Sequence, residues 1–246
     1  MLSELSIIIP CLNEEHYLPK LLDSLTRQNF TGKMEVLVVD GQSEDKTVDR
    51  AKEFNNKIQG LRVISIGRGT ARQRNFGAVK AKYNILLFMD ADDRLPDHYL
   101  NKLVGKVNDA RPFVVSVPFL PSSGGLLDYI FIPFAYMILF CLSLINPLTP
   151  GGFFMTRKEE FLKIGGFAED SILFEDVDCG RRLIKGGAHW HFFPTLPIYS
   201  SARRAKELGL WKLFLLYVKA FWYVQKHGPI TKDSGFDYPY GHYKGD

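Results

Sequence analysis

Short apolar runs alternate with helical patterns along the first half of the chain. Five runs are rich in β-branched residues and have the length of strands: 5–9, 35–39, 61–66, 85–89 and 113–119. Between them, apolar residues recur at helical spacing over 18–25, 48–54, 71–81 and 98–107. This alternation predicts an α/β fold with a central, mostly parallel sheet flanked by helices on both faces.

Ligands of such a sheet bind beyond the carboxyl ends of its strands, and polar residues follow the first two runs. After the first run, Pro10 is expected to end the strand pairing, and Asn13 is expected to cap the next helix. Asp40 follows the second run, in a turn that leads into a helix. An ordinary capped turn explains each of these two segments as well as a ligand-binding loop does. The motifs in the rest of the sequence are needed to choose between the two interpretations.

Two carboxylates directly follow the fourth run, at Asp90 and Asp92. Alternate residues of a strand share a face, so both side chains can reach one cation. Carboxylate oxygens suit Mg²⁺ or Mn²⁺. Such triplets are also common in acidic loops. Taken with its position at a strand end, the pair predicts a divalent-metal site that could hold a diphosphate.

The segment 67–77 is rich in glycine and arginine and partly matches a dinucleotide fingerprint. The match fails because Arg72 stands where the third glycine is needed, and no phosphate-binding loop of the G-x-x-x-x-G-K-[ST] type occurs in the chain. Arg68, Arg72 and Arg74 are instead interpreted as phosphate or carboxylate binders, with a solvated helix face as the alternative.

Composition narrows the class of partner. The chain has 246 residues, 46% of them hydrophobic, which is enough for a sizeable core. A net charge of +4 fits anionic ligands or membranes but is too weak to predict nucleic-acid binding. The three cysteines have no disulfide or zinc spacing, and the first residues lack the features of a secretory signal. We therefore expect this protein in the cytoplasm.

The run 129–145 is uncharged and just reaches the length of a membrane span. Three alternatives stay open: an interfacial or re-entrant helix, a buried core helix or subunit interface, and a full span. A span is disfavoured because the chain must return to the same site, and no second run is available for that. Pro133 and the aromatic residues favour the interfacial helix.

A second aromatic stretch, 208–224, carries only two charged residues, Lys212 and Lys219, seven positions apart and so on one helix face. The pattern suits a bilayer surface or an ordinary packing helix. Peripheral membrane contact through 129–145 and 208–224 would bring the protein to the inner face of the membrane. It would also favour a ligand that is linked to a lipid.

At this point the order of motifs resembles family 2 glycosyltransferases, which have the GT-A fold. The first four motifs are Ile7-Ile8-Ile9-Pro10-x-x-Asn13-Glu14, Val38-Val39-Asp40-Gly41-x-Ser43-x-Asp45-x-Thr47, Arg74-Asn75-x-Gly77 and Phe88-Met89-Asp90-Ala91-Asp92-Asp93. Two more are Gly151-Gly152-Phe153-Phe154-Met155-x-Arg157, continuing to Ile164-Gly165-Gly166-Phe167, and Phe174-Glu175-Asp176-Val177-Asp178 with Arg182-Leu183. The resemblance covers about residues 3–205. It implies a GT-A domain over 1–205, with a nucleotide-binding half at 1–120 and an acceptor half at 121–205. An amphipathic helix and tail follow at 206–246.

The resemblance also implies a donor site. Its donor-binding residues would be Pro10, Asn13, Glu14, Asp40, Arg74, Asp90 and Arg203. Asp40 would accept a ring N–H of uracil or guanine, and Arg74 would approach the nucleotide or its phosphates. Asp90 would meet the ribose or the metal, and Asp92 would ligate Mn²⁺ or Mg²⁺. Arg203 and Arg204 would hold the departing diphosphate, unless they form a plain helix start on the surface.

For the transfer step, the resemblance implies Asp176 as the general base and Glu175 as a residue that orients the acceptor. An acidic first helical turn is the alternative explanation for this pair. His189 and His191 alternate along a predicted strand at 188–193 and could face the same cleft, which makes them candidates for a metal or diphosphate role. The other histidines are expected to be structural or on the surface.

The sequence thus predicts an inverting glycosyltransferase that moves a sugar from a UDP- or GDP-linked donor to a hydroxyl or phosphate of a glycan or polyprenyl-linked acceptor. A sugar nucleotidyltransferase would share the fold and the metal, but it should open with a glycine-rich loop where 10–13 stands. A non-catalytic nucleotide-sugar-binding relative should have lost acids, whereas this chain retains Asp40, Asp90, Asp92 and Asp176.

Overall fold

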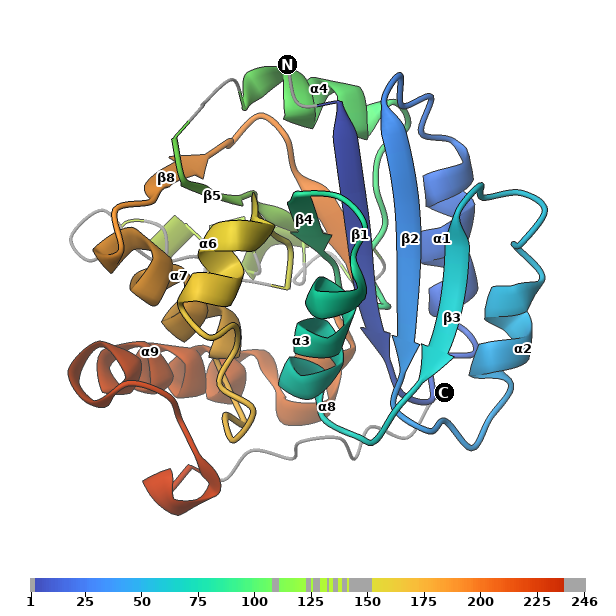
Figure 1. Ribbon diagram of the computed structural model, residues 1–246. Coiled ribbons are helices and arrows are strands. Elements are labelled where there is room, and N and C mark those ends of the chain that lie inside the picture. The colour runs from blue at the N-terminus through green and yellow to red at the C-terminus, as the bar shows by residue number, and fades with distance from the viewer. Residues whose placement is uncertain are drawn as a thin grey trace.

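A seven-stranded sheet forms the centre of the computed structural model, which describes residues 3–107, 111–122, 125, 129–131, 133–134, 137–138, 141 and 152–236 (Figure 1). The strand order is β3-β2-β1-β4-β7-β5-β8, and a separate pair joins β6 to β9. The strands are β1 (Glu4–Cys11), β2 (Lys33–Asp40), β3 (Leu61–Ser65), β4 (Ile85–Phe88), β5 (Phe113–Ser116), β6 (Phe119–Pro121), β7 (Phe154–Arg157), β8 (His189–Phe192) and β9 (Ile198–Ser200).

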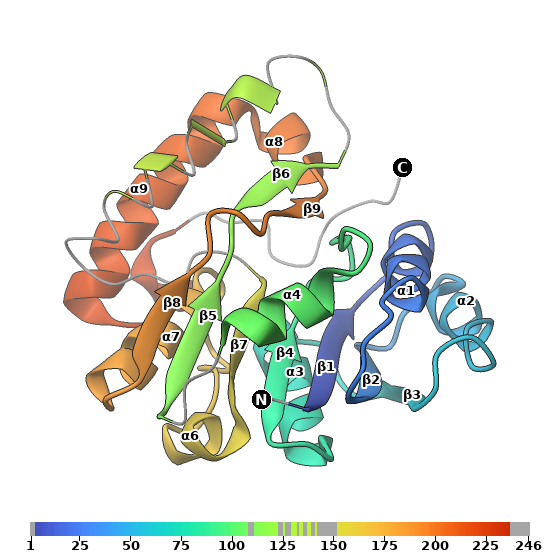
Figure 2. The same cartoon turned by 90° about the horizontal axis from the view of Figure 1, so that it is seen from above.

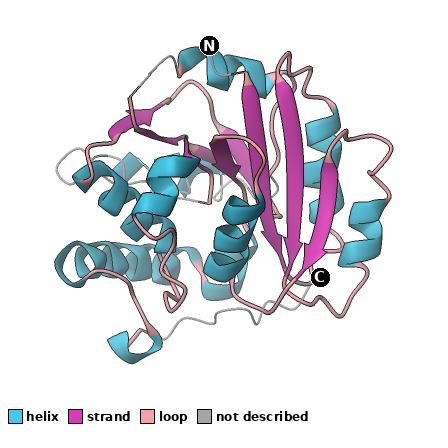
Figure 3. Ribbon diagram, viewed as in Figure 1, coloured by secondary structure: helices cyan, strands magenta, loops and turns pink. Residues whose placement is uncertain are grey.

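Helices cover both faces of this sheet (Figure 3). They are α1 (Leu18–Thr26), α2 (Thr47–Lys52), α3 (Thr70–Lys80), α4 (Tyr99–Lys106), α6 (Lys158–Lys163), α7 (Glu175–Lys185), α8 (Arg203–Leu208) and α9 (Leu210–His227), with a short 3₁₀ turn, η1 (Lys232–Ser234). One apolar core lies between the sheet and α1, α2 and α4, and the other between the sheet and α3, α6 and α7. The predicted mostly parallel sheet with helices on both faces is confirmed.

The unbroken apolar runs are explained by burial on both sides of the strands. In β1, Ile7 and Ile9 join the first core, whereas Ile8 between them joins the second. All three are fully buried. A central parallel strand therefore needs apolar residues at every position, which is why the sequence shows a run there and no alternation.

Two strand boundaries differ from the prediction. Pro10 does not end β1, which continues to Cys11 and stays paired with β2 through Pro10↔Val39. The missing N–H is tolerated because the pairing of β1 with β4 ends at Ile8, so at Pro10 only one side of the strand is paired. The predicted strand 113–119 is divided into β5 and β6 on either side of Pro118, as expected of a residue that cannot donate to a ladder.

The antiparallel strand β7 sits between β4 and β5 and interrupts the parallel order. It brings the segment around Gly152 to the end of β4, next to Asp90. The predicted boundary at residue 205 stays a prediction. Beyond it, α9 packs Ala220, Phe221 and Val224 into a third core with residues 172–177.

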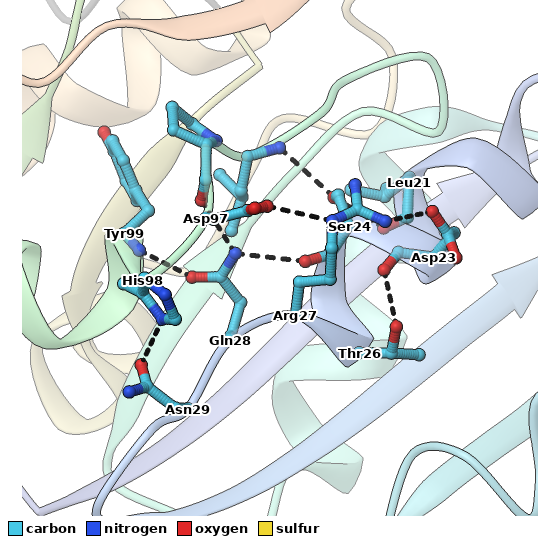
Figure 4. A network of polar contacts seen from close by, with 12 residues as sticks. Leu21, Asp23, Ser24, Thr26, Arg27, Gln28, Asn29, Asp97, His98 and Tyr99 are labelled. Atoms are coloured by element: carbon cyan, nitrogen blue, oxygen red, sulfur yellow. Dashed lines mark hydrogen bonds and ion pairs between the residues drawn. The ribbon is translucent and has the colours of Figure 1, made fainter.

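The loop that carries Asp90 and Asp92 is anchored at its far end by a polar network (Figure 4). The Gln28 side-chain oxygen accepts hydrogen bonds from the backbone N–H groups of Tyr99 (2.8 Å) and Leu100 (3.1 Å) at the start of α4. The Gln28 amide donates to the carbonyl of Pro96 at 2.8 Å. The His98 side chain does not cap α4. Gln28 instead accepts hydrogen bonds from the N–H groups in its first turn, which have no partner within the helix.

Of the segment 129–145, the structure describes 129–131, 133–134, 137–138 and 141, all of them helical. The remainder of that prediction lies outside the described residues. Among the helices that are described, none has the length and apolar character needed to cross a bilayer.

Gly77→Ala is expected to destabilise the protein by about 1 to 2 kcal/mol, because overpacking costs more than the gain in helix propensity. A Cβ at Gly77 would lie 2.5 Å from Cγ2 of Ile8, where α3 crosses β1. Gly105→Ala is the matched control, since a Cβ on this exposed α4 glycine meets nothing within 4 Å. The control should stabilise by roughly 0.5 kcal/mol. Denaturant unfolding measures both, and equal effects would contradict the close helix–strand contact.

Candidate active site

The loops after β1 and β2 are interlocked at the carboxyl edge of the sheet. The Asn13 N–H donates to the Ser43 hydroxyl, and the Asn13 side-chain oxygen accepts from the Glu44 N–H, both at 2.9 Å. The predicted helix cap by Asn13 is therefore wrong: α1 begins at Leu18, and Asn13 adopts φ 54° and joins the two loops. Pro10 and Glu14 flank this junction in the chain.

Asp40 is buried at the end of β2 and organises its own loop. Its carboxylate accepts hydrogen bonds from the Ser43 N–H and hydroxyl and, at 3.0 Å, from the Ser65 hydroxyl. Gln73, which sequence reasoning missed, donates to the carbonyl oxygens of Cys11 (2.8 Å) and Val39 (2.6 Å). The only hint in the sequence was its place between two arginines on α3. Gln73 keeps the ends of β1 and β2 together behind the site.

Arg74 lies beneath the site as a buried link between two acids. Its guanidinium donates to Asp90 at 2.5 Å and to Glu175 at 2.7 Å, and only 3% of the side chain is exposed. Burial lowers the pKa of Arg74, but the carboxylates of Asp90, Glu175 and Asp176 outweigh it, and the net shift is upward. The group thus stays charged. Arg68 pairs with Glu44, and Arg72 is exposed, so the three arginines predicted as a set separate in the structure.

Asp176 lies in the first turn of α7, directly after Phe174 and Glu175. Glu175, Asp176 and Asp178 all fall within this first turn, a position that both the catalytic assignment and the alternative of an acidic helix start allow. Burial, followed by the charge of Glu175, raises the pKa of Asp176 to about 8, and Arg74 opposes this shift. Asp176 is thus a carboxyl group whose proton affinity matches that of a general base near neutral pH.

Arg203, at the start of α8, connects the C-terminal part of the chain to the first motif. It donates to the Glu14 carboxylate at 2.8 and 3.3 Å, and one of its nitrogens lies 3.9 Å from an Asp92 oxygen. The Arg203 side chain is 8% exposed, so the alternative of a surface position is wrong for this residue, whereas Arg204 is exposed. Burial raises the pKa of Glu14 to about 7, and Arg203 opposes this shift.

Asp90, Asp92 and Asp93 form an acidic turn at the end of β4. Burial and the charge of Asp90 raise the pKa of Asp92. Asp93, which sequence reasoning passed over although it adjoins the motif, is buried, accepts from the Asp90 N–H at 3.0 Å and is hydrogen-bonded by Ser200 of β9. Asp93 therefore fixes the turn and attaches it to the strand that leads to Arg203.

The acidic turn fits a divalent cation in part. Asp90 and Asp92 offer hard carboxylate oxygens, and their mutual repulsion at a largely buried site would be relieved by a positive ion. Space is kept beside Asp90, because a Cβ on Gly152 would lie 2.2 Å from its Oδ2. In the part of the chain that the structure describes, no group of three or more His, Cys, Asp or Glu side chains is arranged to hold a metal. Two carboxylates suffice where substrate phosphates complete the shell, as is usual for Mg²⁺.

Gly152→Ala is expected to abolish metal-dependent ligand binding, because the added Cβ would occupy the position of the Asp90 carboxylate. The Asp90 carboxylate would have to move from its present position beside Arg74. Nucleoside-diphosphate binding with and without Mn²⁺, measured by calorimetry, tests this. Gly105→Ala serves as the control, since no atom lies within 4 Å of its Cβ and its backbone is helical within α4. Undiminished metal dependence in Gly152→Ala would contradict the role of this space.

The two histidine candidates lie away from this cluster. His189 and His191 are on β8, the outer strand, which β5 and β7 separate from β4. His191 stacks on Phe193, with ring centroids 6.0 Å apart. Their position favours the structural interpretation.

Comparison with known proteins gives consistent matches. The family model described as "Glycosyl transferase family 2" matches residues 6–165. The poly(ribitol-phosphate) beta-N-acetylglucosaminyltransferase TarS of Staphylococcus aureus is 35% identical over 113 residues, which is 44% of this chain and 18% of TarS. The probable glycosyltransferase YdaM of Bacillus subtilis is 26% identical over 213 residues, which is 79% of this chain and 50% of YdaM. The matches thus span no more than half the length of these two relatives.

Solved structures confirm the predicted GT-A fold. The mannosyltransferase PcManGT from Pyrobaculum calidifontis, in complex with GDP-Man and Mn²⁺, superposes with a TM-score of 0.69 at 22% identity, covering 88% of this chain and 64% of PcManGT. S. aureus TarS 1–349 in complex with UDP-GlcNAc gives a TM-score of 0.64 at 21% identity, covering 80% of this chain and 58% of that one.

Proposed function

Because this chain belongs to glycosyl transferase family 2, we propose that it is an inverting glycosyltransferase that moves a sugar from a nucleoside-diphosphate sugar to an acceptor hydroxyl or phosphate. One observation carries the proposal: two buried arginines join acids from separate motifs at one edge of the sheet. Arg74 joins Asp90 to Glu175, and Arg203 joins Glu14 to Asp92. A core does not need this concentration of buried charge, and such clusters are typical of functional sites.

On the donor side, Arg203 supplies a guanidinium next to the acidic turn, and its planar fork suits diphosphate oxygens. In the proposed complex it exchanges Glu14 for the diphosphate. Asp40 accepts a ring N–H of the base while Ser43 and Ser65 hold its carboxylate, and Pro10 and Asn13 line the pocket. TarS with UDP-GlcNAc and PcManGT with GDP-Man support a UDP- or GDP-linked donor.

Asp92, together with Asp90, is proposed to hold Mn²⁺ or Mg²⁺. When bound, the ion supplies positive charge against the diphosphate leaving group. The Mn²⁺ of the PcManGT complex supports this assignment. Arg74 contributes by holding the Asp90 carboxylate in place from below.

In the proposed transfer step, Asp176 takes the proton of the acceptor hydroxyl. The acceptor oxygen bonds to the anomeric carbon as the bond to the diphosphate oxygen breaks on the opposite face, which inverts the centre. The diphosphate leaves with the bonding electron pair. Glu175, held by Arg74 at 2.7 Å, orients the acceptor. A cytoplasmic site is proposed, because Cys11, Cys141 and Cys179 are free thiols, as in a reducing compartment.

A thermal-shift screen of nucleoside diphosphates and nucleotide sugars, with and without Mn²⁺ or Mg²⁺, tests the donor assignment. A ligand present at about 100 times its Kd stabilises the folded state by about 2.7 kcal/mol. We expect UDP or GDP ligands to raise the melting temperature with the metal present, and Asp92→Asn to remove the metal-dependent part. If no nucleotide raises the melting temperature with either metal, the proposal is wrong. Pyrophosphate release from a nucleoside triphosphate and a sugar 1-phosphate would favour the nucleotidyltransferase alternative.

A further inference from the structure

Exposed apolar side chains are concentrated on one part of the surface. Among the described residues, ten large hydrophobic side chains are solvent-exposed, and seven of them belong to α9 or to the helical segment within 129–141. We call these seven the apolar face: Tyr129, Ile130, Phe134, Met137, Trp211, Leu215 and Trp222. Three of them, Ile130, Trp211 and Leu215, are more than 60% exposed. Scattered exposed hydrophobics need no explanation, but a group of this size indicates a binding surface.

The described helical residues of 129–141 lie alongside α9 (Figure 2). The ring centroid of Phe131 lies 5.1 Å from that of Trp211 and 6.1 Å from that of Phe214. Trp211, Leu215 and Trp222 recur at helical spacing and form one stripe along α9. Ala220, Phe221 and Val224 lie on the opposite side and are buried in the third core. α9 therefore has two apolar sides: one is buried in the third core, and the other, the stripe, is exposed to solvent.

Positive charge borders this stripe. Lys212, Lys219 and Lys226 recur every seven residues, so they form a row beside Trp211, Leu215 and Trp222, and all three are exposed. The sequence of α9 contains no Asp or Glu. An apolar stripe with tryptophans and a flanking lysine row matches a helix that lies in the plane of a bilayer, with its lysines reaching the lipid phosphates. A second copy of this chain would bring a second lysine row against the first.

We propose that the apolar face and its lysine row dock this protein onto the surface of a lipid bilayer that carries anionic headgroups. The helices lie in the interface without crossing it, in agreement with the finding that no described helix could span a membrane. The apolar side chains enter the boundary between headgroups and acyl chains, and the lysines contact phosphates.

The helix that carries this surface also contacts the proposed site, through its side that packs against the third core. Tyr217 of α9 packs against Phe174, the residue before Glu175 and Asp176, with ring centroids 5.2 Å apart. At the other end, Gly209 alone separates α9 from α8, which carries Arg203. Resting on the proposed function, this connection implies an acceptor whose reacting hydroxyl or phosphate is presented by the membrane. The acceptor class is then a lipid-linked one.

Vesicle co-sedimentation of the full chain tests the docking. We expect sedimentation with phosphatidylcholine vesicles that contain phosphatidylglycerol, and weaker sedimentation without it. Trp211→Ser and Leu215→Ser should each lower the partition coefficient about tenfold, because each removes one inserted side chain. Lys212→Gln and Lys226→Gln should each lower it about fivefold on anionic vesicles only, whereas the ammonium of Lys219 already lies over the ring of Phe236 at 4.8 Å. The matched controls are Val79→Ser and Leu162→Ser, which change exposed apolar residues elsewhere and should have no effect.

The result that overturns the proposal is absent vesicle binding, or variants of the apolar face that bind as well as the wild type. A concentration-dependent dimer in analytical ultracentrifugation that Trp211→Ser disrupts, without vesicle binding, would assign the face to a second copy and also overturn it. Nucleotide thermal shifts on the same variants separate the two proposals. Vesicle binding without any nucleotide binding refutes the proposed function alone, and the reverse refutes the docking alone.

Discussion

Asp176→Asn is expected to abolish sugar transfer while nucleotide binding persists. The amide has nearly the same shape as the carboxyl group but cannot take the acceptor proton, and a positioned general base contributes about 10²- to 10⁴-fold. Asp176 is 8% exposed, and its Oδ1 accepts from the Val177 N–H at 2.9 Å, a bond that the amide oxygen can keep. Release of nucleoside diphosphate from the donor measures the rate, and the metal-dependent thermal shift measures binding.

The pH profile provides a second test of the same assignment. Burial raises the pKa of Asp176 to about 8, so the carboxyl is protonated over much of the neutral range in the free protein. Since only the ionised form accepts a proton, kcat/KM should rise with pH about tenfold per unit and level off above 8. The residual kcat/KM of Asp176→Asn should not rise with pH in this way. If kcat/KM of the variant rises with pH as in the wild type, the titrating group is a residue other than Asp176.

Measurements of stability will distinguish loss of the general base in Asp176→Asn from unfolding of the variant. The pKa of Asp176 is raised on folding from an ordinary value of 3.8, so the neutral form favours the folded state. This contribution is complete below about pH 4 and is lost as the pH rises through 8. Asp176→Asn removes this dependence and should be at least as stable as the wild type at neutral pH. Asp170→Asn, an exposed acid nearby, should change neither rate nor stability. Unchanged turnover in Asp176→Asn would refute the base assignment.

The sequence predicted those parts of the fold that are buried on both sides. Strands such as β1 appear as apolar runs because their two faces meet different cores, and the family resemblance, now confirmed, fixed the GT-A arrangement. The strands β7 and β9 were missed for a physical reason. Neither Phe-Met-Thr-Arg of β7 nor Ile-Tyr-Ser of β9 is an unbroken apolar run, and pairing with strands distant in the chain defines both.

In the candidate site, residue types could be predicted, but the direction of a side chain could not. Asp90, Asp92 and Asp176 follow from strand ends and motifs, whereas nothing local shows that Arg74 turns inward and Arg72 outward. Gln73, Asp93 and Gly152 act through contacts with residues from other elements or with the turn itself. Such contacts exist only after the sheet has formed, so a linear pattern carries little trace of them.

Arg74→Ala is expected to destabilise the fold by about 3 kcal/mol or more, because breaking a buried pair leaves the opposite charges without a partner. Both Asp90 and Glu175 would lose their cation, and their side chains are only 25% and 15% exposed. For a chain of this size the melting temperature should fall by roughly 10 °C. Arg74→Lys keeps the charge but cannot donate to both acids from a planar fork, so an intermediate loss is expected.

Two outcomes distinguish a buried link from the phosphate contact that the sequence predicted for Arg74. A residue that only touches the nucleotide would leave stability unchanged and raise the donor KM. A buried link lowers stability without any ligand present, and it weakens metal-dependent binding because Asp90 is no longer held. Arg72→Ala is the matched control on the same helix, exposed and two residues away, and should leave the melting temperature within about 1 °C. Equal melting temperatures for Arg74→Ala and Arg72→Ala would refute the link and return Arg74 to the nucleotide. A loss confined to Arg74→Ala would instead identify Arg74 as the residue that lets three acids from distant motifs, Asp90, Glu175 and Asp176, lie together in one site.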